Sequence, residues 1–469
     1  MNFEVVIGLE VHAQLSTESK MFCACSSDYQ EAEPNTVVCP VCMGMPGVLP
    51  VINRRAVEHV IRTGLALGCE ISSYTKFDRK NYPYPDLMKG YQISQYDLPI
   101  ASNGSMPIEV DGVRRSAGIT RVHLEEDVAK LMHRTEEFGE GYSLLDVNRA
   151  GVPLMEVVGE PDLRSPEEAR AYLVQLHSIL HVRPVGQVEL GTKVEIKNMN
   201  SYRSVFRALE YEAERQIEVV RSGRRIVQET RGWDEEESVT FSQRIKEGAS
   251  DYRYFPEPDL PPLRISPEWV TEVQASIPEL PHTRKNRFVH QLGLPEYDAG
   301  LLTASQSTAD YFEAVLTAAP SGPDLSGQFA KAISNWMLGE MARLLNQSGQ
   351  HISDVRIEPA QVAELQTMVD DSTLSSTMAK TVFEKMFETG LPPRKIAEFE
   401  GLVQISDTDA VQTAVLEAIA ANPDPVQDYL AGKQQAMGFL VGQVMKATRG
   451  KANPRMASQM VREHLEAMR

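Results

Sequence analysis

Polar and apolar residues alternate along Val6–Leu15, "VIGLEVHAQL", close to the start of the chain. Alternation with a period of two predicts a β-strand, because successive side chains of a strand point to opposite faces. One face would carry Leu9, Val11, Ala13 and Leu15, and the other Glu10, His12 and Gln14. The strand therefore places a carboxylate and an imidazole side by side.

Two later stretches, 111–132 and 142–158, also show strand-type patterns. A helix is expected from Ser165, where Ser-Pro-Glu-Glu supplies a cap and a capping-box Glu168, and it should stop before Arg183-Pro184. A second helix should begin near Ser201 and be closed by Gly223.

From about Leu294 onward the chain has almost only helix-period segments with short breaks. The pattern predicts an α+β protein in which a front part of mixed strands and helices is followed by an all-α back part. A chain of 469 residues is too long for one ordinary core, which agrees with several domains.

A second polar strand face is expected in "RVHLEEDVAK". Alternation puts His123, Glu125 and Asp127 on one face and Glu126 on the other. Acids in a strand of this kind are costly to bury without cations. Combined with Glu10 and His12, the three acids Glu125, Glu126 and Asp127 would form an oxygen-rich site with one imidazole, which suits Mg²⁺. The alternative is an exposed edge strand with ordinary charges.

Cations and tyrosines are interleaved in "DRKNYPYPDLMKGYQISQYD", which contains Arg79, Lys80 and Lys89. Such a mixture can hold phosphates and stack a base, although a proline-rich surface loop would look the same. Lys193, Glu195 and Lys197 share one face of an expected strand just before a helix N-terminus, which is a natural place for an anion. The sequence contains no Walker P-loop, so any use of ATP would need another kind of site.

Four of the five cysteines, Cys23, Cys25, Cys39 and Cys42, fall within twenty residues. Paired cysteines at this spacing favour a structural, four-thiolate zinc site in a zinc-ribbon-like insert at 23–42. The alternative is a loop with four reduced thiols. Cys69 stands alone in an apolar segment and is expected in the core.

The net charge of −18 argues against non-specific coating of nucleic acid. The C-terminal segment 431–469 differs, because seven Lys and Arg residues stand there against two Glu. Lys433, Lys446, Arg449, Lys451 and Arg455 are candidates for a nucleic-acid contact, against the alternative of a solvated helical tail. The sequence shows no membrane-length apolar run and no signal-peptide pattern, and we expect a cytoplasmic protein.

The motifs "VIGLEVHAQL", "CPVCMGMPGVLPVIN", "FDRKNYPYPDL", "HLEEDVAK", "LLDVNRAGVPLMEVV" and "DYRYFPEPDLPP" occur in this order along the chain. Together they resemble the GatB/GatE family, the B-type chains of aspartyl/glutamyl-tRNA amidotransferases. The tail "GKQQAMGFLVGQVMKATRGKANP" resembles the part that this family shares with YqeY-like proteins. The resemblance implies a glutamine-synthetase-like antiparallel sheet, the cradle, at 1–293. An all-α helical domain at 294–402 and a YqeY-like tail that grips tRNA, at 403–469, would follow it.

The resemblance also implies an activity. Such a protein phosphorylates the side-chain carboxylate of Glu-tRNA(Gln) or Asp-tRNA(Asn) with ATP and converts it into the amide. Ammonia would come from glutamine in an amidase partner (GatA type), and a small third chain (GatC type) would complete a heterotrimer. Glu10, His12, Glu125, Glu126 and Glu156 become candidates for catalysis, the first four of them as Mg²⁺ ligands. Arg79, Lys80, Lys89 and Lys193 become candidates for phosphate binding.

One departure from the family concerns the residues after Leu180. Members usually continue with a stretch of the form Glu-Glu-Gly…Arg-x-Asp-x-Asn-x-Ser before "VRPVG", whereas this chain passes directly from "LHSIL" to "HVRPVG". The lost stretch contains acids and would be expected to form a strand. A catalytically impaired, tRNA-binding scaffold is therefore the alternative function.

Overall fold

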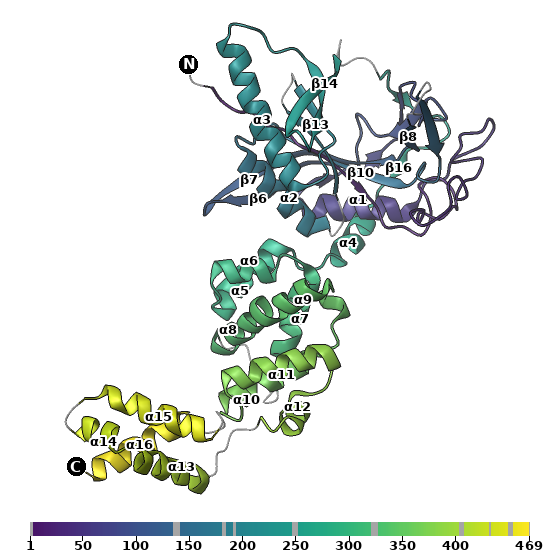
Figure 1. Cartoon of the computed structure of the whole chain (residues 1–469). Coiled ribbons are helices and arrows are strands. Elements are labelled where there is room, and N and C mark those ends of the chain that lie inside the picture. The colour runs from purple at the N-terminus through teal and green to yellow at the C-terminus, as the bar shows by residue number, and fades with distance from the viewer. Residues whose placement is uncertain are drawn as a thin grey trace. The chain divides into compact units, whose positions relative to one another are not determined.

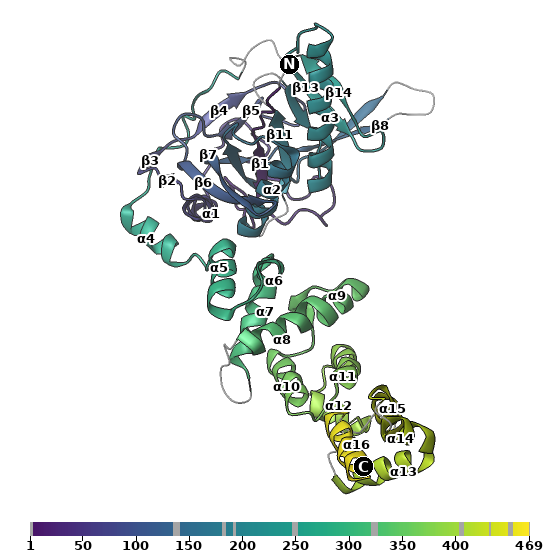
Figure 2. The same cartoon turned by 90° about the vertical axis from the view of Figure 1, so that its left-hand side faces the viewer.

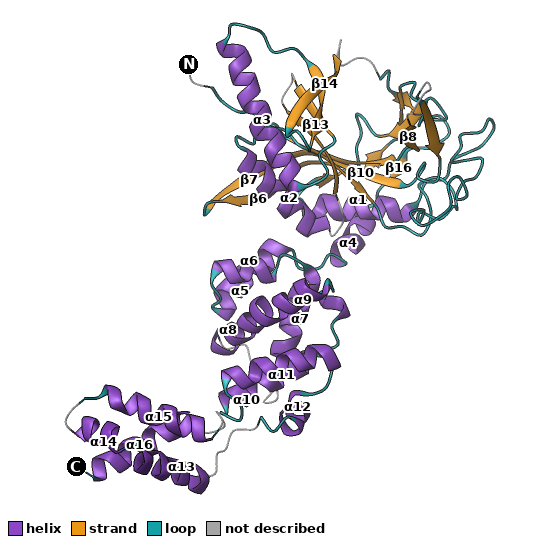
Figure 3. Ribbon diagram, viewed as in Figure 1, coloured by secondary structure: helices purple, strands orange, loops and turns teal. Residues whose placement is uncertain are grey.

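The computed structural model divides the chain into two compact units, Met1–Leu280 and Pro281–Arg469. It describes residues 3–134, 141–180, 184–190, 194–245, 252–319, 327–402, 408–430, 433–448 and 454–468. Figure 3 shows that the strands belong to the first unit and that the second unit is helical. The expected α+β class is confirmed.

A nine-stranded sheet forms the frame of the first unit (Figure 1). Its strands lie in the order β14 (Val239–Ile245), β13 (Glu229–Asp234), β12 (Val194–Lys197), β11 (Pro184–Leu190), β1 (Glu10–Gln14), β10 (Pro153–Gly159), β7 (Val113–Glu126), β6 (Ala101–Val110) and β2 (Glu70–Ile71). Neighbours are antiparallel except β12 and β13, which run parallel. A helix joins these two strands, and a helical crossover returns the chain in the same direction.

One face of the sheet is apolar and is covered by helices α1 (Arg54–Ala66), α2 (Pro166–Leu180) and α3 (Tyr202–Arg221), as Figure 2 shows. Val11 of β1 pairs in register with Val157 of β10, which pairs with Val122 of β7, and all three are fully buried. Because side chains alternate along a strand, this buried face leaves the intervening polar residues together on the other face.

The helix starts follow the expected capping signals. Ser201 Oγ accepts a hydrogen bond from the Ser204 N–H at 3.0 Å, and Ser165 Oγ accepts one from the Glu168 N–H at 3.2 Å. The capping box at α2 is incomplete, because the Glu168 carboxylate accepts from the Arg164 N–H at 2.7 Å, one residue before the cap. Both helices nevertheless begin within a residue of the positions that the sequence predicted.

Three small sheets complete the first unit. They are β15 (Phe255–Pro256) with β4 (Asp78–Asn81) and β5 (Tyr91–Ser94), then β16 (Leu263–Arg264) with β3 (Tyr74–Thr75), and β8 (Lys130–Arg134) with β9 (Tyr142–Asp146). The end of β5 lies against the end of β7, where the Ile93 N–H donates to the Glu126 carboxylate at 2.9 Å. The short ladder of β15 on β4 brings a proline-rich loop of distant sequence next to this region.

The second unit consists of helices, as the helix-period pattern predicted. They are α5 (Pro281–Leu292), α6 (Glu296–Leu302), α7 (Gln306–Thr317), α8 (Gly327–Trp336), a π-helical turn at Met337–Met341, α9 (Ala342–Ser348), α10 (Pro359–Asp370), α11 (Ser376–Thr389), α12 (Pro393–Phe399), α13 (Thr408–Ala421), α14 (Pro423–Leu430), α15 (Gln435–Ala447) and α16 (Pro454–Ala467). A 3₁₀ turn at Ile352–Asp354 precedes α10, and α4 (Pro267–Ala275) still belongs to the first unit.

The unit boundary lies at Leu280 and not near residue 293, because α5 packs with the helices that follow it. The buried hydrophobic residues of the second unit form separate clusters, one from Phe288 to Ala397 and one from Val411 to Leu465. The second unit therefore has two separate apolar cores among its described residues.

The cysteine-rich segment 23–42 is described throughout, and it forms turns without any strand. An isolated bridge joins Ser19 to Ser26. The expectation of a ribbon was therefore wrong, because a ribbon requires a hairpin. Among the described residues, no helix has both the length and the apolar character that crossing a membrane requires.

Candidate functional site

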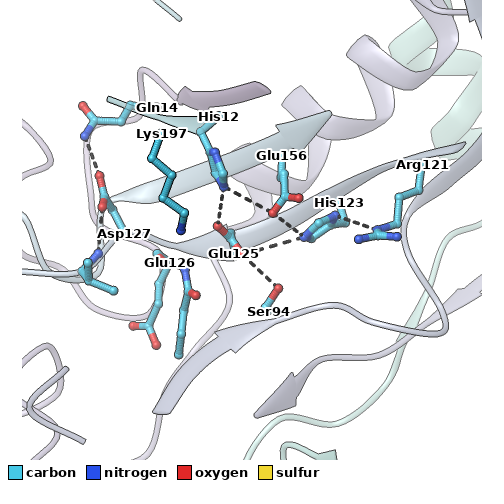
Figure 4. Close-up of polar contacts among 12 residues, drawn as sticks. His12, Gln14, Ser94, Arg121, His123, Glu125, Glu126, Asp127, Glu156 and Lys197 are labelled. Atoms are coloured by element: carbon cyan, nitrogen blue, oxygen red, sulfur yellow. Dashed lines mark hydrogen bonds and ion pairs between the residues drawn. The ribbon is translucent and has the colours of Figure 1, made fainter. Parts of the chain in front are cut away.

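The polar face of the central strands brings one carboxylate between two imidazoles (Figure 4). Glu156 of β10 is directly opposite His12 of β1 on one side and His123 of β7 on the other. Glu156 Oε2 lies 3.3 Å from His12 Nε2 and 3.4 Å from His123 Nε2. The strand register therefore fixes this row of three side chains.

Glu125, two residues after His123 on β7, completes the cluster. Its Oε1 lies 3.4 Å from His12 Nε2, and its Oε2 accepts a hydrogen bond from Ser94 Oγ at 3.0 Å. One ligand atom each from His12, Glu125 and Glu156 lies within 4.8 Å of the others. Both carboxylates are buried, so the geometry is suited to holding a cation.

The buried charges stabilise one another. Burial opposes the charge of His12, but hydrogen bonds to Glu125 and Glu156 raise the pKa of His12 to about 10. Burial alone would raise the pKa of Glu125 and Glu156, yet the two imidazoles hold both values well below the usual range. The two glutamates are therefore ionised at neutral pH.

Two lysines face the cluster. Lys80 of β4 has a raised pKa, because the negative charges around it, first that of Glu125, outweigh the effect of its burial. Lys197 of β12 points toward the same side chains in Figure 4, and its Nζ lies 3.1 Å from Glu195. The site therefore has cations beside its carboxylates, as a site for phosphates requires.

Two candidate metal ligands lie apart from this cluster. Glu10 shares the strand face of His12 but is one step further along, opposite Val158, and it is not among the clustered ligand atoms. Glu126 projects from the other face of β7 and is paired with Lys89. The structure does not place Glu126 near His12, because adjacent residues of a strand face opposite sides.

The candidate phosphate-binding residues also divide. Arg79 makes a two-point contact with the buried carboxylate of Glu257, from Nε at 2.6 Å and from Nη2 at 2.8 Å. Lys89 and Glu126 line a cavity of about 180 Å³ beside Cys42. Arg79 and Lys89 thus have carboxylate partners, whereas Lys80 faces the cluster; Lys193 lies outside the described residues.

The four clustered cysteines lie together, with sulfur atoms within 4.8 Å of one another. Cys39 Sγ is 3.8 Å from Cys42 Sγ, the spacing expected for two corners of a tetrahedron with Zn–S bonds of about 2.3 Å. A hydrogen bond from Cys23 lowers the pKa of Cys42 to about 4, and the Cys39 N–H and the Lys20 charge act in the same direction. The arrangement suits a metal ion that binds thiolates.

The basic tail is only partly described. Lys433 is exposed and lies 2.9 Å from Asp428, and Lys446 is exposed on α15. Arg449 and Lys451 lie outside the described residues, and for Arg455 only its place on α16 is described.

The sequence alone did not single out Ser94 or Tyr254. The ring of Tyr254 is close enough to Lys80, Glu125 and Glu156 for their charges to act on it. Ser94 and Tyr254 come from short strands or loops whose pairing no local pattern predicts. Lys197 was named by the sequence pattern, because it shares a face with Lys193 and Glu195 on the expected strand before α3.

Comparison with known families shows which family this chain belongs to. The pattern of the GatB/GatE catalytic domain matches residues 5–184 and 180–271, and that of the GatB domain matches residues 310–465. The chain belongs to the GatB/GatE family. The suspected resemblance is therefore confirmed over both units.

Full-length relatives agree with this assignment. The chain is 52% identical over 487 residues to the B subunit of the aspartyl/glutamyl-tRNA(Asn/Gln) amidotransferase of Dehalococcoides mccartyi, with 99% of each chain covered. It is 53% identical over 490 residues to the protein of the same name from Caldicellulosiruptor saccharolyticus, with 99% of this chain and 100% of the relative covered. It is 51% identical over 486 residues to that of Thermoanaerobacter pseudethanolicus, with the same coverage.

The matches also bear on the stretch missing from this GatB-family chain. The catalytic-domain pattern matches in two pieces that meet at residues 180–184. The alignment with the Dehalococcoides relative, at 487 residues, is longer than the whole chain of 469. Both observations agree with a deletion after Leu180, where α2 ends and the sheet continues into β11.

Proposed function

We propose that this chain is the component of a tRNA-dependent amidotransferase that activates the side-chain carboxylate of Glu-tRNA(Gln), Asp-tRNA(Asn) or both. A carboxylate oxygen would attack the γ-phosphorus of ATP and release ADP, and ammonia would then attack the acyl carbon and release phosphate. The cluster of His12, Glu125 and Glu156 carries this proposal, because a buried cation site flanked by lysines is what phosphoryl transfer needs.

The donor set fits Mg²⁺. Two ionised, buried carboxylates meet the preference of this cation for oxygen, and the remaining positions would be available to water and phosphate oxygens. When bound, Mg²⁺ would neutralise charge that develops on the transferred phosphoryl group. The imidazole of His12 is a less usual ligand for Mg²⁺, and its ion pairs with both glutamates would also hold them in place.

The surrounding residues would position the substrates. Lys80 and Lys197 would hold phosphate oxygens, and Ser94 would orient Glu125 through its hydrogen bond. Glu10, on the same strand face as His12, would act on the side from which ammonia arrives. Glu126 and Lys89 would pair with each other on the opposite face of β7, next to the cavity that they line. Arg79 would hold Glu257 in place, and Lys80 would be the residue that binds phosphate directly.

The partners follow from the name of the relatives, which describes one part of a larger enzyme. We propose a heterotrimer in which a GatA-type amidase releases ammonia from glutamine and a small GatC-type chain completes the complex. The exposed basic residues of the tail, Lys433 and Lys446 among those described, would contact the tRNA.

We also propose a structural Zn²⁺ on Cys23, Cys25, Cys39 and Cys42. Four sulfurs at tetrahedral spacing within a segment that lacks strands would give the loop an internal support.

The scaffold alternative is not favoured by the full-length relationships. The polar cluster also remains assembled in spite of the deletion, because its residues come from β1, β7 and β10, which pair with one another in register.

The test is an amidation assay on the complex reconstituted with its amidase and its small third chain, with free ammonia and each misacylated tRNA in turn. Amide formation that requires both ATP and Mg²⁺ is expected. Tight tRNA binding without amide formation or ATP consumption would instead support the scaffold.

A further inference from the structure

Four tyrosines lie together beside the polar cluster. Tyr252 contacts Tyr82 edge to face at a centroid distance of 5.7 Å and Tyr254 at 6.2 Å. Tyr254 in turn stacks on Tyr96 at 4.3 Å, with an angle of only 10° between the rings. The phosphoryl-transfer chemistry proposed above does not require such a stack.

The loop that supplies two of these rings is held in place. The Asn81 N–H donates to the Tyr252 carbonyl at 2.9 Å, and Asn81 Nδ2 donates to the Arg253 carbonyl at 2.8 Å. Arg253 has a φ of +41°, in the left-handed region that non-glycine residues rarely adopt. A backbone held in this way presents Tyr254 in a defined position against Tyr96.

The stack reaches from the cluster to the surface. Tyr254 is close enough to Lys80, Glu125 and Glu156 for their charges to act on it, and burial raises its pKa to about 12. Tyr96 is 55% exposed, and its N–H is held by the buried Asp78 carboxylate at 3.2 Å. Arg253, between Tyr252 and Tyr254 in the sequence, is exposed.

We propose that the Tyr96–Tyr254 stack receives the 3′-terminal adenine of the misacylated tRNA and so directs its aminoacyl group toward the cluster. This proposal rests on the function proposed above. In such a substrate the reacting carboxylate is joined through the aminoacyl ester to the terminal ribose, so the terminal base must lie beside the site. A base stacks on an aromatic ring irrespective of sequence, as an enzyme acting on more than one tRNA requires.

Adenine also occurs in ATP, and the position of the stack favours the tRNA end. A polynucleotide must leave the site through solvent, and the stack has its outer ring, Tyr96, at the surface. A nucleotide whose phosphates lie at Lys80 has no need of an exposed platform.

The reconstituted heterotrimer with Tyr96→Ala, Tyr96→Phe or Tyr297→Ala tests this assignment in the ammonia-dependent assay. Tyr297 is a matched control, because it is 76% exposed on α6 in the other unit. Tyr96→Ala should raise the KM for misacylated tRNA about tenfold and leave the KM for ATP unchanged, since one base-stacking contact is lost. Tyr96→Phe keeps the ring and should resemble the wild type, as should Tyr297→Ala. An unchanged KM for tRNA, or an increase confined to ATP, would overturn the proposal.

A second measurement does not depend on catalysis. An acceptor-stem minihelix with 2-aminopurine as its terminal base should lose fluorescence on binding to the wild-type complex, because stacking quenches the base. The quenching should disappear with Tyr96→Ala and persist with Tyr96→Phe. If no complex forms amide, the proposed function fails, but the quenching still shows whether the terminal base stacks on Tyr96. Quenching that persists in Tyr96→Ala would refute the role of the Tyr96–Tyr254 stack.

Discussion

His12 and Glu156 occupy directly opposed positions on β1 and β10, and His12 Nε2 lies 3.3 Å from Glu156 Oε2. Their strand positions are set by backbone hydrogen bonds, so the two side chains meet without any loop to position them. A rigid sheet is a favourable support for a catalytic site, because small displacements of positioned groups are costly to the rate.

The adjacent residues Glu125 and Glu126 should respond differently to the same change. We expect Glu125→Gln to lower the affinity for Mn²⁺, used as a spectroscopic substitute for Mg²⁺, at least about tenfold and amidation about a hundredfold, because a buried anionic ligand is lost. Glu126→Gln should keep Mn²⁺ binding and lower the thermal unfolding midpoint, because Lys89 loses its buried partner. Electron paramagnetic resonance titration and thermal unfolding measure the two effects. Equal Mn²⁺ affinities would contradict the assigned faces.

The cysteine cluster should bind one Zn²⁺ per chain. Cys25→Ser should lower zinc content to less than about half an equivalent and reduce the unfolding midpoint, because one of four thiolates is lost. Cys69→Ala is the control, since Cys69 is buried in the main core of the first unit, apart from the other cysteines. Elemental analysis of protein purified under reducing conditions provides the readout, and full zinc retention in Cys25→Ser would count against four-sulfur coordination.

The contact between Arg79 and Glu257 should be structural. Glu257 is 3% exposed and holds Arg79 at two points, while the guanidinium also lies over the Tyr91 ring at 4.2 Å. Arg79→Met should lower stability by about 3–5 kcal/mol, because it leaves a carboxylate buried without its partner. Thermal unfolding measures the loss.

The control for this prediction is Arg264→Met, at an exposed position of β16, which should have little effect. An Arg79→Met variant with unchanged stability and a raised KM for ATP would instead restore Arg79 as a phosphate ligand.

Acid should weaken the helical unit through Glu313. Burial opposes its charge, but hydrogen bonds from Arg287 and Arg284 lower its pKa below the usual value. A lowered pKa in the folded state adds stability at neutral pH that is lost as the pH falls from the ordinary range of about 4.5 toward the lower folded value. Glu313→Gln should therefore be less stable than the wild type at pH 7, and the difference should shrink below about pH 4. Unfolding midpoints across this range provide the measurement, and a pH-independent difference would exclude the linkage.

Much of the site followed from alternation along single strands. The faces of Val6–Leu15 and of the HLEED strand are those of the structure, since His12, Glu125 and His123 share the polar face and Val11, Val122 and Leu124 are buried on the other. The helix starts at Ser165 and Ser201 were likewise readable, because capping depends on residues three positions apart.

Pairings between distant segments could not be read in this way. The sequence grouped Glu126 with the metal ligands, although its alternation already placed it on the opposite face, and only the fold shows that Lys89 is its partner. Arg79 was expected to bind phosphate, yet in the structure its guanidinium pairs with the carboxylate of Glu257. The cysteine segment was expected to be a ribbon, but it forms turns. The spacing of cysteines predicts metal ligands and does not predict the backbone conformation that joins them.

The sequence by itself determined the family, the α+β class, the strand faces and the candidate site side chains, because these depend on local periodicity and on ordered motifs. Only the tertiary structure decided which of those side chains meet. Strand register put Glu156 between His12 and His123, and the loop at 252–254 brought Tyr254 against Tyr96. Such contacts depend on the packing of segments far apart in the chain, which no local pattern specifies.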